Sequence, residues 1–255
     1  MSADRDPFYV GYHPVAPAGV AARVRKHVVA LAVFTAGAAV LLAASQRRAD
    51  PGVFEYGTVR PYLGRIQMLP YPSLLVPGTG GPGRGAAYTR YLLVAEGKHG
   101  ADPLLQGLDS RWVELRGTRI ARSGREMLEV PARGIAGASA PGSDSLLVPA
   151  AVSLGRYSLR GEVVDSKCWL GVMKPATGNV HRGCAARCLS GGIPPILMTR
   201  DSTGAVRHYL LADSAGGEAP EWFAGLAGRT VAVSGELVAY GDLEVLRIER
   251  TVVEY

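Results

Sequence analysis

The stretch Trp112-Val-Glu-Leu-Arg-Gly-Thr-Arg-Ile120 recurs, 118 positions later, as Thr230-Val-Ala-Val-Ser-Gly-Glu-Leu-Val238. Both stretches alternate apolar and polar residues, as a half-buried β-strand does, and both have glycine at the sixth position. Both lead into a short turn that contains glycine, Ser123-Gly124 in the first case and Tyr240-Gly-Asp242 in the second. The repeated strand and turn predict two copies of one small β domain.

Further matches extend the repeat along the chain. Tyr91-Leu-Leu-Val-Ala corresponds to Tyr209-Leu-Leu-Ala-Asp, again 118 positions on. Four single positions keep the same offset: Leu108, Arg111, Val113 and Gly117. In the last strand, Leu128-Glu-Val130 matches Leu243-Glu-Val245 at an offset of 115, which predicts a second hairpin three residues shorter than the first. Because several blocks match in order, we interpret the chain as an internal duplication.

The composition and the turn pattern indicate the fold class. The 33 glycines and 17 prolines favour many short strands over a helical bundle. Each copy contains about five strands with a V-x-V-x-G-x-[LI] hairpin, which is typical of a small Greek-key barrel of the OB type. An irregular β-sandwich is the alternative. We therefore expect a mostly β protein, with OB-like domains over residues 52–133 and 152–255 and a linker over 134–151.

A long apolar segment precedes these domains. Residues 28–45 (VVALAVFTAGAAVLLAAS) carry no charge, and as a helix they would rise about 27 Å, close to the hydrocarbon thickness of a bilayer. A cleaved signal peptide is disfavoured because the polar region before the run is long and no A-x-A site follows it. A core helix is disfavoured because the segment has no polar face. The sequence therefore predicts a single transmembrane helix.

Flanking charge predicts the orientation of this helix. Arg23, Arg25 and Lys26 on its N-terminal side narrowly outnumber Arg47 and Arg48 on its C-terminal side. The positive-inside rule then keeps residues 1–27 in the cytoplasm as a tail and places the β domains on the outer face.

The net charge of +6 does not come from one basic cluster. The arginines of the first domain are scattered: Arg84, Arg90, Arg111, Arg116, Arg119, Arg122 and Arg125. A solvated β surface accounts for this pattern, so a nucleic-acid-binding role is disfavoured. Binding of an oligosaccharide or a single strand on a barrel face stays as an alternative, but it needs exposed aromatic residues, and these make up only 7 % of the chain.

The two copies differ between their first two strands. Measured from Gly64 to Pro72 in the first copy and from Gly171 to Pro194 in the second, the second copy contains about fifteen additional residues. His181, Cys184 and Cys188 lie within this insertion, and Cys168 lies just before it, at the end of a predicted strand. Since the first copy has no such segment, the insertion indicates a function or a local crosslink.

The spacing within the insertion suits metal binding. If residues 180–189 form a helix, His181, Cys184 and Cys188 are spaced i, i+3 and i+7 and share one face, which Cys168 can approach from the strand. Three thiolates and one imidazole are a complete tetrahedral ligand set for zinc and a possible site for copper(I).

Two other interpretations of the same residues stay open. Three cysteines are an odd number, so in an oxidising compartment Cys168 can form a disulfide with Cys184 or Cys188 and leave one thiol free. Alternatively, the thiols exchange disulfides with a partner or hand on copper or zinc. No Cys-x-x-Cys or Cys-x-x-Cys-His motif supports a redox or haem assignment. His99 and His208 have no ligand spacing and are expected at the surface.

The pattern Gly161-x-Val-Val-Asp-x-Lys-Cys168, His181-x-x-Cys-Ala-x-x-Cys188 and Gly192-Ile-Pro-Pro covers roughly residues 159–198. It resembles a group of bacterial exported or membrane-anchored proteins, which look like accessory partners of periplasmic redox enzymes. The resemblance implies an inner-membrane protein with periplasmic domains and a protein partner such as a redox or respiratory complex. It assigns no catalytic role to the cysteines or to His181. We therefore expect a non-catalytic, membrane-anchored accessory protein.

Overall fold

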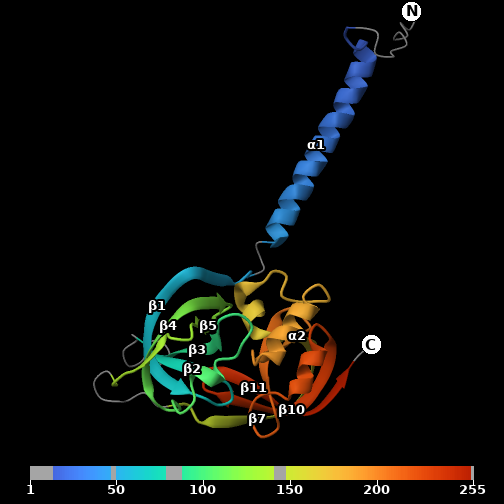
Figure 1. Ribbon diagram of the computed structural model, residues 1–255. Helices are drawn as coiled ribbons and strands as arrows, with labels where there is room; N and C mark the ends of the chain where they lie inside the picture. The colour runs from blue at the N-terminus through green and yellow to red at the C-terminus, as the bar shows by residue number, and fades with distance from the viewer. Residues whose placement is uncertain (1–13, 47–49, 79–87, 141–147, 254–255) are drawn as a thin grey trace, which may run out of the picture. The chain divides into compact units, whose positions relative to one another are not determined.

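The computed structural model describes residues 14–46, 50–78, 88–140 and 148–253 (Figure 1). The chain forms two compact units, residues 1–50 and 51–255, and each is described by itself. The first part of the predicted cytoplasmic tail, residues 1–13, lies outside the described residues.

In the described part of unit one, residues 14–46 and Asp50, the structure has one helix, α1 (Ala18–Gln46). It is long and apolar enough to cross a membrane, with a mean hydropathy of 2.3 over its most apolar 18 residues, and a signal sequence can have the same length and composition. Its apolar side chains are exposed, for example Phe34 at 74 %. The helix begins at Ala18, before the apolar run predicted over 28–45. It can extend this far because residues 18–46 contain no proline that would break it.

The first half of unit two is a closed five-stranded barrel. Its strands follow the order β1-β2-β3-β5-β4, and β1 also pairs with β4, which closes the ring. The β3–β5 pairing is parallel and the other pairings are antiparallel. The strands are β1 (Val53–Gln67), β2 (Ser73–Pro77), β3 (Tyr88–Ala95), β4 (Trp112–Arg122) and β5 (Arg125–Val130), and a short helix, η1 (Asp102–Leu104), lies between β3 and β4.

The second half of unit two repeats this topology. Its strands form a closed barrel in the order β7-β8-β9-β11-β10, and again only the third and fifth strands, β9 and β11, pair in parallel. The elements are β7 (Ala151–Asp165), β8 (Pro195–Arg200), β9 (Val206–Ala212), β10 (Thr230–Tyr240), β11 (Leu243–Val253) and the short helix η3 (Glu221–Leu226). The predicted mostly β fold with an N-terminal apolar helix and OB-type barrels is confirmed.

Strand pairing corrects one detail of the predicted repeat. Arg122 pairs with Arg125 in the first hairpin and Tyr240 with Leu243 in the second, so both turns contain two residues. The offset of 118 therefore continues through the last strand, and the counterpart of Leu128 is Leu246. The predicted offset of 115 was wrong because β11 continues as Leu-Glu-Val-Leu, and its first leucine was matched in place of its second.

Pairing also redefines the insertion. Gly64 lies opposite Val113 in the first barrel, and Gly161 lies opposite Val231 in the second, so the counterpart of Gly64 is Gly161 and not Gly171. The first barrel passes from β1 to β2 through residues 68–72, whereas the second passes from β7 to β8 through residues 166–194. The insertion is thus longer than expected, and Cys168 lies inside it.

The segment expected as a linker, residues 134–151, also carries structure. Its strand β6 (Ile135–Gly137) pairs with β4, and β7 begins at Ala151. Residues 141–147 lie outside the described residues.

The barrels pack against each other through equivalent faces. Each barrel has its own interior core, and a further core cluster draws on both. This shared cluster includes four residues of the first barrel together with their counterparts 118 positions on in the second: Leu92, Val94, Ile120 and Met127, and Leu210, Ala212, Val238 and Val245. The two predicted domains therefore share a core, which places residues 51–255 in one compact unit.

Polar groups reinforce this interface. The Arg90 guanidinium is almost fully buried and donates to the Asp242 carboxylate (2.9 Å) and to the Tyr240 carbonyl (2.8 Å) of the second barrel. Tyr71, from the 68–72 connection, donates to the Leu211 carbonyl at 2.6 Å. These buried contacts fix how the two barrels pack against each other.

Candidate metal centre

The insertion begins with a tight turn that Asp165 caps. Asp165 is the last residue of β7, and its Oδ1 accepts a hydrogen bond from the Cys168 N–H at 2.8 Å. The next residues form a π-helical turn, η2 (Cys168–Val172), in which Gly171 adopts a φ of 153°. A Cβ at Gly171 would lie 2.9 Å from the Val53 nitrogen, so this close approach requires glycine. The turn buries Cys168 beside the barrel.

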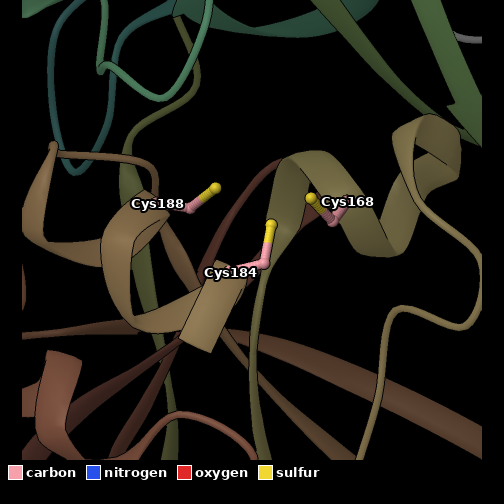
Figure 2. A group of neighbouring side chains, drawn as sticks. All are labelled: Cys168, Cys184 and Cys188. Atoms are coloured by element: carbon pink, nitrogen blue, oxygen red, sulfur yellow. The ribbon is translucent and has the colours of Figure 1, made fainter. Parts of the chain in front are cut away.

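The predicted helix over residues 180–189 is present as α2 (Arg182–Ser190), with His181 at its N-cap position. Gly191 ends the helix, and its N–H donates to the Cys188 carbonyl at 3.1 Å. Cys184 and Cys188 are one turn apart and therefore share a face of α2. Figure 2 shows both side chains directed toward Cys168, which approaches from η2.

The structure brings the three sulfur atoms together, within 4.8 Å of one another. All three cysteines are unbridged, so the predicted disulfide between Cys168 and one of the helical cysteines stays a prediction. Cys168 and Cys188 are only 3 % and 2 % exposed, while Cys184 is half-buried. The cluster is therefore shielded from solvent on most sides.

His181 lies beside this cluster as half of a buried pair. Its Nε2 lies 3.0 Å from Asp165 Oδ2, and both side chains are buried. The Asp165 carboxylate, the Cys168 sulfur and a His181 ring nitrogen form a second group within 4.8 Å, so Cys168 belongs to both groups. The four predicted ligands are thus neighbours, and Asp165, to which the sequence pattern gave no role, connects two of them.

Lys98 from the first barrel reaches the sulfur cluster. Its ammonium donates to Cys184 Sγ at 2.9 Å. The Lys98 backbone lies against the end of α2, because a Cβ on Gly191 would clash with the Lys98 carbonyl oxygen. The sequence offered no signal for this residue, since Lys98 lies in the other copy and its contact depends on how the barrels pack.

Hydrogen bonds within the cluster shift the pKa values of two of its thiols in opposite directions. The hydrogen bond to Cys188, together with burial, raises the pKa of the Cys168 thiol. Accepting that hydrogen bond lowers the pKa of Cys188, and the contact with Cys184 raises the pKa of Lys98. Cys168 is therefore the donor and Cys188 the acceptor of this pair, and metal binding would displace the proton that the two thiols share.

Lys167 fixes the start of the insertion to the first barrel. Its ammonium is buried and donates to the Ala95 carbonyl (3.0 Å), the Gly97 carbonyl (2.6 Å) and the Glu129 carboxylate. A buried ammonium is tolerated only when it is paired in this way. The residue directly before Cys168 therefore has a positioning role.

The expectation that His208 lies at the surface was wrong. Its ring is half-buried, 4.4 Å from the Trp169 ring, and its Nε2 accepts a hydrogen bond from Arg125 Nε. Burial, with the neighbouring charges of Arg125 and Arg122, lowers the pKa of His208 to about 4. The outward face of β9 is buried because the first barrel covers it, which the local sequence does not reveal. His99 is exposed, as expected.

Two clefts lie elsewhere on the unit. One of about 350 Å³ lies at the end of α2 and is lined by Leu189, Ile193 and Phe223 among others, and one of about 240 Å³ is lined by Arg90 and Arg125 among others. No cysteine lines either cleft, so these cavities provide no substrate pocket at the sulfur atoms.

Comparison with known proteins assigns no family to this chain. No protein-family model matches it, and no curated protein matches it. A crystal structure of a deletion mutant of the single-stranded DNA binding protein from Thermus aquaticus is similar at 13 % sequence identity and a TM-score of 0.24, over 80 % of this chain and 96 % of that chain. The OB assignment of the two barrels rests on their strand order and not on this match.

Proposed function

We propose that this protein is a non-catalytic, membrane-anchored accessory protein that holds one thiophilic metal ion, zinc or copper(I), at Cys168, Cys184 and Cys188. The observation that carries the proposal is the convergence of three unbridged sulfur atoms within 4.8 Å of one another. Around tetrahedral zinc, neighbouring sulfur atoms are about 3.8 Å apart. The limit of 4.8 Å is about 1 Å above that separation, so at most a small contraction of the cluster is needed.

A bound metal accounts for features that a scaffold does not need. The first barrel closes with the short 68–72 connection, so the longer insertion is not required for folding an OB barrel. Thiolate ligands select zinc and copper(I) over hard cations such as magnesium and calcium. The ammonium of Lys98 supplies a positive charge against the thiolates. These features together favour a centre built for a soft metal ion.

The location and the partner follow from the anchor and from the sequence pattern. Helix α1 can act as a membrane anchor, and the flanking charges favour barrels on the outer face, in the periplasm of a bacterium. The pattern from Gly161 to Pro195 resembles accessory partners of periplasmic redox enzymes. The proposed partner is therefore a redox or respiratory complex in the inner membrane.

A thiol–disulfide exchange protein is the second candidate. The lowered pKa of Cys188 favours it, because the thiolate is the attacking species. However, Cys188 is only 2 % exposed, and exchange requires access for a second sulfur. The half-buried Cys184 is the accessible one of the three. The burial of Cys188 therefore favours metal binding over thiol–disulfide exchange.

Single-strand or oligosaccharide binding has less support. OB folds bind such ligands on the face formed by their second and third strands. In this protein the outward residues of the third strands, Leu92 and Val94 in β3 and Leu210 and Ala212 in β9, are buried in the core between the barrels. That face is therefore occupied by the neighbouring barrel.

Metal analysis of the full chain tests the proposal. The protein is purified in detergent under reducing conditions, and metal content and chelator competition are measured. We expect one zinc or copper ion per chain, and at least a 100-fold loss of affinity for Cys168→Ser, Cys184→Ser or Cys188→Ser. Ser190→Ala, on the exposed side of α2, is the control and should bind as the wild type does. A second preparation, purified without reductant, tests the disulfide: a metal-free protein whose native mass is two hydrogens below its reduced mass would establish a bridge in place of the metal.

Alkylation separates the two candidates. At mildly acidic pH, iodoacetamide should modify the metal-loaded protein slowly, and removal of the metal by a chelator should accelerate the reaction. Rapid modification that does not depend on metal would favour the thiol-exchange protein.

A further inference from the structure

We infer that Asp165 positions two ligands of the metal centre, and that His181 is the fourth ligand and binds through Nδ1. This inference rests on the proposed metal-binding function. It assigns the ring nitrogen through which His181 binds the metal, and it gives Asp165 the role of holding ligands without binding the metal itself.

The two carboxylate oxygens of Asp165 have separate partners. Oδ1 accepts the hydrogen bond from the Cys168 N–H at 2.8 Å, and Oδ2 lies 3.0 Å from His181 Nε2. Asp165 is fully buried, so both contacts form away from water, where charge-assisted hydrogen bonds are strong. One side chain thus fixes both the backbone of Cys168 and the ring of His181.

The chemistry of imidazole assigns the metal-binding nitrogen. A neutral imidazole has one N–H donor and one nitrogen with a free lone pair. Because a carboxylate accepts, Nε2 carries the proton, and Nδ1 keeps the lone pair. Histidines that bind metals usually donate their other N–H to a carboxylate in this manner. One ring nitrogen of His181, either Nδ1 or Nε2, lies within 4.8 Å of the Cys168 sulfur, so the ring lies beside this ligand.

The first barrel provides an internal comparison for Asp165. The Gln67–Ser73 pair of the first barrel is equivalent to the Val164–Ile196 pair of the second. Met68, which follows Gln67, is therefore the counterpart of Asp165, which follows Val164. An OB barrel therefore does not need an aspartate at this position. Burying a carboxylate costs free energy unless it is well paired. The aspartate occurs in the copy that has the candidate ligands, which argues for a role toward them.

A purely structural role for Asp165 is the competing explanation, and a matched carboxylate controls for it. Glu162, three residues earlier in β7, accepts a hydrogen bond from the Gly178 N–H at the start of the loop before α2. It therefore also attaches the insertion to the barrel, but it contacts none of the proposed ligands in the described contacts. Glu162→Gln removes a similar charge without touching a ligand.

The experiment compares four full-length proteins loaded with zinc: wild type, Asp165→Asn, His181→Ala and Glu162→Gln. X-ray absorption at the zinc edge counts sulfur and imidazole ligands, and chelator competition gives Kd. For the wild type we expect three sulfurs and one imidazole nitrogen. The imidazole signal should disappear in His181→Ala. In Asp165→Asn it should weaken, with Kd rising roughly 10- to 100-fold and the sulfur count unchanged. Glu162→Gln should match the wild type.

The outcomes separate this inference from the proposed function. Zinc bound by three sulfurs and an oxygen in the wild type, with an unchanged Kd in Asp165→Asn and His181→Ala, overturns the inference and leaves the metal-binding function intact. A wild type that binds no metal overturns both. Near-ultraviolet circular dichroism of the aromatic side chains, Trp169 among them, monitors folding. If Asp165→Asn fails to fold, the imidazole signal of the wild type against His181→Ala decides the matter.

Discussion

Lys98 shows how one residue of the first barrel affects the chemistry of the second. Its ammonium lies 2.9 Å from Cys184 Sγ. Three thiolates around Zn²⁺ leave one net negative charge, which this ammonium can balance. The contact is partly open to solvent, so its contribution is small compared with that of the ligands.

Replacing Lys98 should therefore weaken metal binding modestly. We expect Lys98→Met to raise Kd for zinc about two- to five-fold, with a larger effect at low salt. Lys174→Met is the matched control, because Lys174 is an exposed lysine of the insertion that donates to the Gly52 carbonyl. Chelator competition measures both variants. Equal effects would contradict a specific role for Lys98.

His208 makes the folding stability of the barrel interface depend on pH. Its pKa is about 4 in the folded protein, whereas the ordinary value is 6.5. Between these values the unfolded chain binds more protons than the folded chain does. The stabilising contribution of the neutral ring is therefore complete above pH 6.5 and is lost as the pH falls toward 4.

This reasoning predicts how acid affects stability. Lowering the pH from 7 to 5 should cost the wild type about 1 kcal/mol through His208, after allowance for the part of the ring that faces solvent. His208→Gln should show a smaller loss over the same range, while exposed His99→Gln should behave as the wild type does. Urea unfolding at the two pH values measures the difference. An identical loss in all three proteins would argue against this role.

At the scale of elements, the contact between α2 and the first barrel depends on a glycine. The end of α2 lies so close to the Lys98 carbonyl that Gly191, its C-cap residue, has no room for a Cβ. Gly183, in the first turn of the same helix, is exposed, and a Cβ added there would meet nothing within 4 Å. The two glycines therefore have different roles, although they lie only eight positions apart.

Alanine at these two positions should have opposite effects. Gly191→Ala forces the first barrel away from α2 and should cost roughly 1–3 kcal/mol of unfolding free energy, with weaker metal binding. Gly183→Ala should stabilise the protein by about 0.5–1 kcal/mol through helix propensity. Urea unfolding of both variants checks the prediction. Similar stabilities for the two would show that the barrels do not meet here.

At the scale of the whole of unit two, the two barrels are joined by a common core. Leu92 and Ile120 of the first barrel pack in the same cluster as their counterparts, Leu210 and Val238, of the second. Equivalent residues therefore meet across the interface, as in a symmetric dimer formed within one chain. Separating the barrels would expose this apolar cluster to water.

The shared core predicts cooperative unfolding. Residues 51–255 should unfold in a single calorimetric transition, and the fragment 151–255 should fail to fold alone because it exposes its half of the core. Circular dichroism and calorimetry of the two fragments test this. Two transitions in the longer fragment, or a folded shorter one, would show that the barrels are independent.

Local patterns in the sequence were sufficient for the elements. Alternation around Gly117 and Gly235 predicted the strands and the duplication, and the spacing of Cys184 and Cys188 predicted that they share one face of the helix now seen as α2. Each of these signals depends on residues a few positions apart. The register of the last strand was not predicted correctly, because an alternating strand offers several equally good local matches.

The sequence by itself determined a mostly β protein with an apolar helix, a repeated barrel and a sulfur-rich insertion in the second copy. Only the tertiary structure decided that the three sulfur atoms converge, that Asp165 holds His181 and that Lys98 arrives from the other barrel. The physical reason is that periodicity and turn chemistry act over a few residues. The surroundings of the sulfur cluster instead depend on the packing of two barrels, which brings together residues far apart in the chain.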